Sequence, residues 1–226
     1  MLMQLTETTT RMFDPRPLGP SDADAVGRLT DGSTLPHAPA LGDLLQNGQV
    51  IGDYAGSDDL QAATALLPLN GQGALVCSLR AAGFGADGQG AVFTPLCLKP
   101  GYGEIRRFLR MALRWAAGQY ASYHLWAVLP FDPARPVTGE ELCAQYLAAG
   151  LNLRGLRAMD GTARMLVFSA APLARWEEPT RRIHLADAAL ARFLERGYAA
   201  SEFGWDRKGL LLELRPVEAH RRQKPE

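Results

Sequence analysis

The hydrophobic periodicity changes within residues 91–129, and this change limits the fold more than any other feature of the sequence. The segment 91–98 is short and apolar and is bounded by glycine and proline, as is typical of a strand. Within 103–119 the apolar residues recur with helical spacing, and a further apolar strand is expected at 123–129. A strand, a helix and a strand over about forty residues indicate a βαβ unit with two parallel strands.

The region before this unit has the pattern of short strands and helices. A strand is expected at 13–18, followed by helices at 21–29 and 39–46. Strands joined by short turns favour antiparallel pairing, and we expect them at 49–54, 62–69, 74–79 and 91–98. The glycine-rich stretch 83–88 is then a hairpin loop, since a strand rather than a helix follows it.

After the βαβ unit, Thr138 is a suitable N-cap for a helix that ends at Gly150. A hairpin of strands 152–159 and 163–170 should turn at Asp160–Gly161. A last helix at 187–196 and a hairpin of strands 201–205 and 210–215 complete the chain. These elements predict an α/β fold: a mixed, mostly antiparallel sheet flanked by helices, with a C-terminal helix-plus-strand extension.

The 226 residues, of which 47% are hydrophobic, are sufficient for one packed domain and an extension. We expect a flexible leader at 1–12, a main domain at 13–175 and a disordered tail at 218–226. The extension at 176–217 should either pack on this domain and cover a sheet edge or mediate a homodimer.

Charge and cysteine content exclude several classes of protein. The 24 basic and 24 acidic residues balance, which gives no reason to expect nucleic acid or a membrane as partner. The three cysteines are far apart, and neither they nor the four histidines have metal-ligand spacing. We therefore expect no metal, and unpaired thiols point to the reducing cytoplasm. The cysteines are Cys77, Cys97 and Cys143.

The junction between the strand 91–98 and the following helix has the composition of an anion site. Gly101 and Gly103 allow close approach of the backbone, and Ile105 and Arg106 lie in the first turn of the helix. A helix N-terminus has unpaired N–H groups and a partial positive charge, so it binds phosphate. Glu104 opposes this, because its carboxylate competes for the same helix end.

The order of elements and the sequence PLCLKPGYG before an arginine-rich helix resemble the GNAT N-acetyltransferase superfamily over residues 13–170. The resemblance implies that acetyl-CoA is the acyl donor. It implies that Gly101, Gly103, Ile105 and Arg106 face the pyrophosphate, and that the backbone of Leu96, Cys97 and Leu98 lines the pantetheine arm. The loop departs from the family pattern Q/R-x-x-G-x-G/A and is about three residues shorter, so the pyrophosphate loop is degenerate.

The helix end AQYLAAGL at 144–151 also resembles this family and places Tyr146 where many members have a general acid. A tyrosine hydroxyl can protonate the departing thiolate, but packing at a helix–sheet junction explains the residue equally well. The family's usual strand carboxylate is missing from 91–94. Glu140, Glu141 and His124 are the candidate bases, and the sequence selects none of them.

The resemblance implies transfer of an acetyl group to the amine of a small molecule or peptide. The alternative is a non-catalytic module of the same fold that binds a ligand or a partner, and a dimer-forming assembly subunit is a third interpretation. The arginines at 106, 110 and 114 either contact the 3′-phosphate of a coenzyme or form a solvated helix face. No partner base for Cys97 as a covalent nucleophile is visible.

Overall fold

The computed structural model describes residues 13–30, 39–121, 124–134, 136–159, 163–173 and 180–217. The expected leader, the C-terminal tail and the turn at Asp160–Gly161 lie outside these ranges. The strands are β1 (Phe13–Leu18), β2 (Val50–Ala55), β3 (Asp59–Pro68), β4 (Ala91–Phe93), β5 (Cys97–Leu98), β6 (Leu125–Phe131), β7 (Asn152–Ala158), β8 (Arg164–Ser169), β9 (Arg181–His184), β10 (Tyr198–Asp206) and β11 (Gly209–Pro216). The helices are α1 (Ala23–Leu29), α2 (Leu41–Gln46), α3 (Ala74–Ala81), α4 (Ile105–Ala117), α5 (Pro136–Ala148) and α6 (Leu190–Glu195), and a 3-10 turn precedes α1 at Pro20–Asp22.

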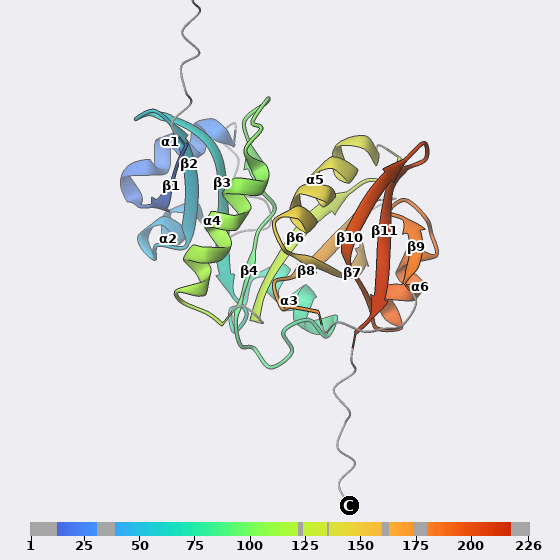
Figure 1. Cartoon of the computed structure of the whole chain (residues 1–226). Helices are drawn as coiled ribbons and strands as arrows, with labels where there is room; N and C mark the ends of the chain where they lie inside the picture. The colour runs from blue at the N-terminus through green and yellow to red at the C-terminus, as the bar shows by residue number, and fades with distance from the viewer. Residues whose placement is uncertain are drawn as a thin grey trace, which may run out of the picture.

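The strands form one continuous sheet in the order β1-β2-β3-β4-β6-β8-β7-β10-β11-β9, with β5 paired to β3 beside this path. Every pairing is antiparallel except that of β4 with β6. Figure 1 shows β1–β3 at one end of the sheet, β9–β11 at the other, and α4 and α5 between them. The predicted fold class, a mixed and mostly antiparallel sheet flanked by helices, is confirmed.

Alternation along the strands divides the core between the two faces of the sheet. In β6, Ala127 and Leu129 pack with residues of α4, α5 and α6, whereas Val128 packs on the opposite face with residues of α1, α2 and α3. The same alternation holds in β4, where Phe93 and Val92 belong to different faces. Helices therefore cover both faces of the sheet.

The parallel pair β4–β6 confirms the predicted βαβ unit, since α4 connects these strands. Ala91 pairs with Leu125, and Phe93 pairs with Ala127. Beyond Phe93 the chain leaves β6, because β5 pairs with β3 through Ala62↔Leu98. The neighbouring strands thus separate at the middle of the sheet, next to α5.

The segment 91–98 is two strands rather than the single strand predicted. Leu66 of β3 pairs with Phe93, and Ala63 of β3 pairs with Cys97. The two pairs are three residues apart on β3 but four residues apart along the segment 93–97. The extra residue is a β-bulge. It lies between Thr94 and Cys97: the Thr94 N–H still donates to the Ala65 carbonyl over 2.9 Å, and the Thr94 hydroxyl accepts a 3.0 Å hydrogen bond from the Ala65 N–H.

The strand predicted at 74–79 is wrong, because α3 occupies this segment. Leu75, Val76 and Leu79 are buried, whereas Cys77 is exposed. Burial at i, i+1 and i+4 is the pattern of a helix face, and a strand would have buried Cys77 with its alternate neighbours. The glycine-rich stretch 83–88 consequently follows a helix and is not the loop of a hairpin.

The C-terminal strands continue the same sheet. β10 joins β7 through Ala200↔Leu153, and β11 and β9 follow at the edge. Leu190 of α6 and Leu212 of β11 are fully buried in the core that also contains α4 and α5. Strand β9 was not predicted, since two arginines interrupt its apolar pattern. The homodimer stays a prediction.

Candidate functional site

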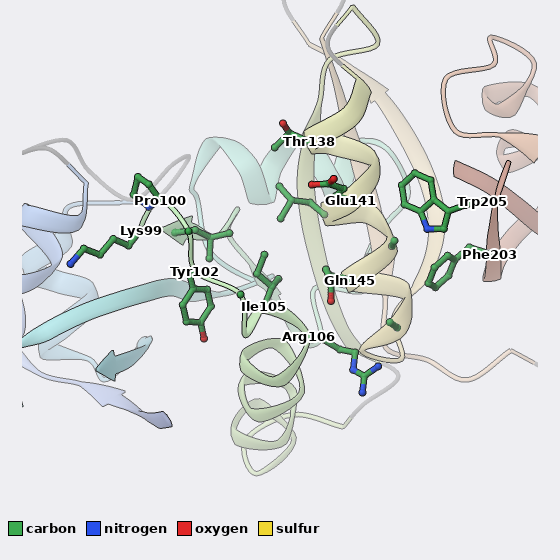
Figure 2. Close-up of a pocket in the computed structure, with 16 residues that line it drawn as sticks. Lys99, Pro100, Tyr102, Ile105, Arg106, Thr138, Glu141, Gln145, Phe203 and Trp205 are labelled. Carbon is green, nitrogen blue, oxygen red and sulfur yellow. The ribbon is translucent and has the colours of Figure 1, made fainter. Parts of the chain in front are cut away.

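A cavity of about 810 Å³ lies where the loop between β5 and α4 meets α5 and β10. Figure 2 shows α5 as its floor, with Pro100 and Tyr102 on one side and Phe203 and Trp205 on the other. The first turn of α4 opens into the same space through Ile105 and Arg106. Residues more than 100 positions apart in the sequence therefore share one cavity wall.

The loop before α4 is a tight turn that requires glycine. The Tyr102 N–H donates a 3.0 Å hydrogen bond to the Lys99 carbonyl, which closes the turn. Gly101 has a φ of 81°, a conformation that side chains with a Cβ adopt only with strain. This turn brings the backbone from β5 directly to the start of α4.

Tyr102 anchors the loop to the sheet. Its side chain is 8% exposed and packs edge-to-face against Phe108 of α4. Its hydroxyl donates a 2.7 Å hydrogen bond to Oδ2 of Asp53 on β2. Asp53 also accepts a 2.9 Å bond from the Asp14 N–H, and burial raises the pKa of its carboxyl group. Sequence reasoning missed this contact, because nothing in the pattern marks Asp53 as a partner.

The N-terminus of α4 is open to the cavity. Within the described part of the chain, the N–H groups of Gly103, Glu104, Ile105 and Arg106 have no hydrogen-bond acceptor. Glu104 occupies the N-cap position, and its side chain forms no capping bond. Unpaired amides and the helix dipole make this turn attractive to an anion.

A smaller cavity of about 450 Å³ continues from the first along α4. Arg106, Arg107 and Arg110 line it, together with Gln145 of α5. Arg110 also donates a 2.9 Å hydrogen bond to the Ala148 carbonyl, which fixes its guanidinium at the C-terminal end of α5. Arg114 lies one turn further on and contacts Met111, so the predicted arginine row does not act as one unit.

Five of the predicted cofactor-binding residues lie in the wall of the larger cavity: Leu98, Gly101, Gly103, Ile105 and Arg106. Leu96 and Cys97 do not line it. Leu96 packs on the face that carries α4, whereas Cys97 packs on the opposite face. Burial raises the pKa of the Cys97 thiol to about 11, so it is protonated at neutral pH and is a poor nucleophile.

Tyr146 is buried beneath the cavity floor, with 1% of its surface exposed. Its ring lies 5.0 Å from that of Phe168. The hydroxyl donates a 3.4 Å hydrogen bond to the Val128 carbonyl of β6 and accepts one from the Leu96 N–H next to β5. Tyr146 thus bridges the two strands where they separate, and burial raises the pKa of its hydroxyl.

The three candidate bases occupy different positions. Glu141 lies in the wall of the larger cavity. Glu140 is 5% exposed and is packed so closely that a Cβ at Gly209 would lie 2.7 Å from its carboxylate oxygens. His124 precedes β6, about 13 Å along the strand from Val128, and lies 3.9 Å from Asp87. Of the three, Glu141 is the one in contact with the cavity.

Several residues of the cavity were not anticipated from the sequence. They include Lys99, Thr138 and Gln145, and the aromatic pair Phe203 and Trp205. The pair stands at i and i+2 of a strand, which places both rings on one face. That spacing was the available signal, but its distance from the glycine loop in the sequence concealed the connection.

The described residues contain no group of three or more His, Cys, Asp or Glu residues that could hold a metal ion. None of their helices is both long enough and apolar enough to span a bilayer.

The sequence matches no protein-family model and no curated protein. Several solved structures are similar at low identity. One is a protein assigned as a phosphinothricin N-acetyltransferase, with 14% identity and a TM-score of 0.49, covering 71% of this chain and 100% of that one. Another is an N-acetyltransferase from Staphylococcus aureus Mu50, with 15% identity and a TM-score of 0.45, covering 70% of this chain and 98% of that one.

A third similar structure is a dodecameric spermidine N-acetyltransferase from Vibrio cholerae, with 14% identity and a TM-score of 0.44, covering 70% of this chain and 94% of that one. All three are described as N-acetyltransferases. At these identities the function has to be inferred from the cavity itself.

Proposed function

We propose that this chain is an acyltransferase that takes an acetyl group from acetyl-CoA and transfers it to an amine. One observation carries the proposal: the unpaired amides at the start of α4 face an open cavity of about 810 Å³. A diphosphate at this turn gains hydrogen bonds from the amides and the charge of Arg106. The three unpaired cysteines agree with a reducing compartment, and we place the reaction in the cytoplasm.

The rest of the donor follows from the position of the diphosphate. The pantetheine arm runs from α4 past Leu98 toward the gap between β5 and β6. The amine nitrogen attacks the thioester carbonyl, the C–S bond breaks, the amine loses a proton and the thiolate gains one. Tyr146 is the proposed proton donor, because its hydroxyl is the side-chain group that bridges this gap. Holding the reactants together supplies most of the rate enhancement.

The proposed acceptor is a small-molecule or peptide amine. A cavity of about 470 Å³ shares Leu98, Lys99 and Pro100 with the donor cavity and is also lined by Asp58 and Asp59. Carboxylates attract an ammonium group, so this second cavity suits a cationic amine that approaches the same segment of chain. The Lys99 ammonium lies 2.6 Å from Asp59 and leaves Asp58 as the carboxylate for the incoming amine.

Binding of acetyl-CoA tests the proposal directly. A ligand at 100 times its dissociation constant stabilises a fold by about 2.7 kcal/mol, which thermal denaturation detects. Arg106→Ala should weaken binding measured by calorimetry, whereas Arg114→Ala, two turns further along α4, is the matched control and should not. Absence of any thermal shift at millimolar acetyl-CoA would contradict the proposal.

The second candidate is a non-catalytic module of the same fold. The burial of Tyr146 favours it, because its hydroxyl already has two backbone partners and is closed off from the cavity. An assay of free thiol release with a panel of amines and peptides separates the two. Binding of acetyl-CoA without turnover of any amine would support the module.

A further inference from the structure

The far wall of the donor cavity is aromatic and comes from the C-terminal strand β10. Phe203 and Trp205 project from one face of this strand, on the side of α5 away from Pro100 and Tyr102 (Figure 2). Phe203 is partly buried against the main core. Trp205 is 52% exposed, and among the described residues it is one of two large hydrophobic side chains with such exposure. An exposed indole in a cavity wall has a free ring face on which a planar ligand can stack.

The position of this wall relative to the phosphate-binding turn limits what it can bind. Figure 2 shows the two sides of the cavity on either side of α5. Because the turn and the aromatic wall line the same cavity of about 810 Å³, a ring joined through a ribose to a diphosphate at the turn extends toward Trp205. Gln145 lies between the two sides and also borders the smaller, arginine-lined cavity.

We propose that Phe203 and Trp205 form an adenine subsite, so that the C-terminal extension selects an adenosine-bearing acyl donor. The proposal rests on the proposed function and adds to it the nucleotide end of the donor. The adenine stacks on Trp205, and Phe203 borders it. Glu141 on the cavity floor supplies an acceptor for the exocyclic amino group. The ribose phosphate then lies toward Gln145 and Arg106.

The distribution of charge favours a nucleotide over a cationic amine in this part of the cavity. Trp205 and Glu141 alone would also suit an ammonium group through cation–π and ionic contacts. However, Arg106, Arg107 and Arg110 stand at the adjoining side, and three guanidinium groups repel a second cation. An adenosine phosphate uses both halves of the cavity at once.

The test compares three ligands that contain different parts of the donor. Coenzyme A contains both the adenosine and the pantetheine. Adenosine 3′,5′-bisphosphate contains the adenosine without the pantetheine, and 4′-phosphopantetheine contains the pantetheine without the adenosine. Calorimetry should show that Trp205→Ala lowers the affinity for coenzyme A and for the bisphosphate at least about fivefold, because the adenine loses its stacking partner. Affinity for 4′-phosphopantetheine should not change. Trp205→Phe should retain most of the affinity.

Val137→Ala is the matched control, since Val137 is the other exposed hydrophobic residue, at 67%, and lies outside the cavity wall. The bisphosphate should also quench the indole fluorescence of the wild type more than that of Trp205→Phe. Equal affinity of Trp205→Ala and wild type for coenzyme A would overturn the adenine subsite alone. So would a rise confined to the KM of the amine, which would assign the aromatic wall to the acceptor. A wild-type chain that binds none of the three ligands would refute both this inference and the proposed function.

Discussion

The Tyr102 hydroxyl donates its hydrogen to the buried carboxylate of Asp53, 49 residues earlier in the chain, over 2.7 Å. This contact fastens the loop before α4 to β2, at the far side of the loop from the cavity. The Lys99 end of the loop is held separately, by a 2.8 Å hydrogen bond from its N–H to the Gln61 carbonyl of β3. The Tyr102–Asp53 pair therefore holds the end of the loop nearest the amides at the start of α4.

Tyr102→Phe should destabilise the fold by about 1–3 kcal/mol, since it leaves a buried carboxylate short of a donor. It should also lower the affinity for acetyl-CoA, because the loop loses its hydrogen bond to β2. Chemical denaturation and calorimetry measure the two effects. Asp53→Asn is the comparison, since an amide can still pair with the Tyr102 hydroxyl and should keep most of the affinity. An unaltered acetyl-CoA affinity in Tyr102→Phe would show that the pair does not position the loop.

The raised pKa of Asp53 predicts the sign of a pH effect. Between its ordinary pKa and the raised pKa of the folded state, the folded protein holds a proton that the unfolded chain has lost. Raising the pH in this window then favours unfolding. The contribution of Asp53 is fully present below the ordinary pKa and is lost as the pH rises through the folded value. The stability of the wild type relative to Asp53→Asn should therefore fall as the pH rises above the ordinary aspartate pKa and through the raised pKa of the folded state. If the stability of the wild type relative to Asp53→Asn instead increased with pH, the pKa of Asp53 would be lowered by folding rather than raised.

Tyr146→Phe should lower kcat about 100-fold and leave the affinity for acetyl-CoA unchanged, as expected for loss of a proton donor. The stability cost should be about 1 kcal/mol, because a hydrogen bond to Val128 is lost while the ring stays packed. Steady-state kinetics and calorimetry on the same preparation measure both. If turnover persists at the wild-type rate, Tyr146 is a packing residue and another group protonates the thiolate.

Gly90→Ala should destabilise the protein by at least about 2 kcal/mol. Gly90 has a φ of 91°, and a Cβ there would lie 2.0 Å from the His124 carbonyl oxygen, next to the first pair of β4 and β6. Gly88→Ala is the matched control: its φ is 70°, but a Cβ would meet nothing within 4 Å. It should cost about 1 kcal/mol from backbone strain alone. Equal costs would mean that the close approach to His124 is relieved by a backbone shift.

The βαβ unit could be predicted from the sequence because the hydrophobic pattern of each of its elements is local. The helix spacing of 103–119 and the apolar strands on either side are each visible within a short window, and the parallel pairing follows from their order. The bulge between Thr94 and Cys97 could not be predicted, because it depends on the count of residues facing β3. Segment 74–79 was misjudged for a related reason: both a strand and a short helix accommodate its apolar residues, and burial on one helix face decided between them.

The candidate site was predictable on the side that the loop builds. Gly101, Gly103, Ile105 and Arg106 were expected from glycine spacing and a helix start, and they line the cavity. The partners that come from distant strands were not expected. Asp53 meets the loop from β2, and Trp205 comes from a strand about 100 residues later, so only the folded chain reveals either contact.

The placement of β10 makes one wall of the cavity depend on a strand about 100 residues from the glycine turn. A polypeptide cut before Trp205 keeps the loop and α4 but loses the aromatic wall of the cavity. It also lacks the leucines of β11 that seal the core beneath α5. Under the adenine subsite proposed above, proteolytic loss of β10 and β11 would therefore end nucleotide binding while leaving every residue of the glycine turn in place.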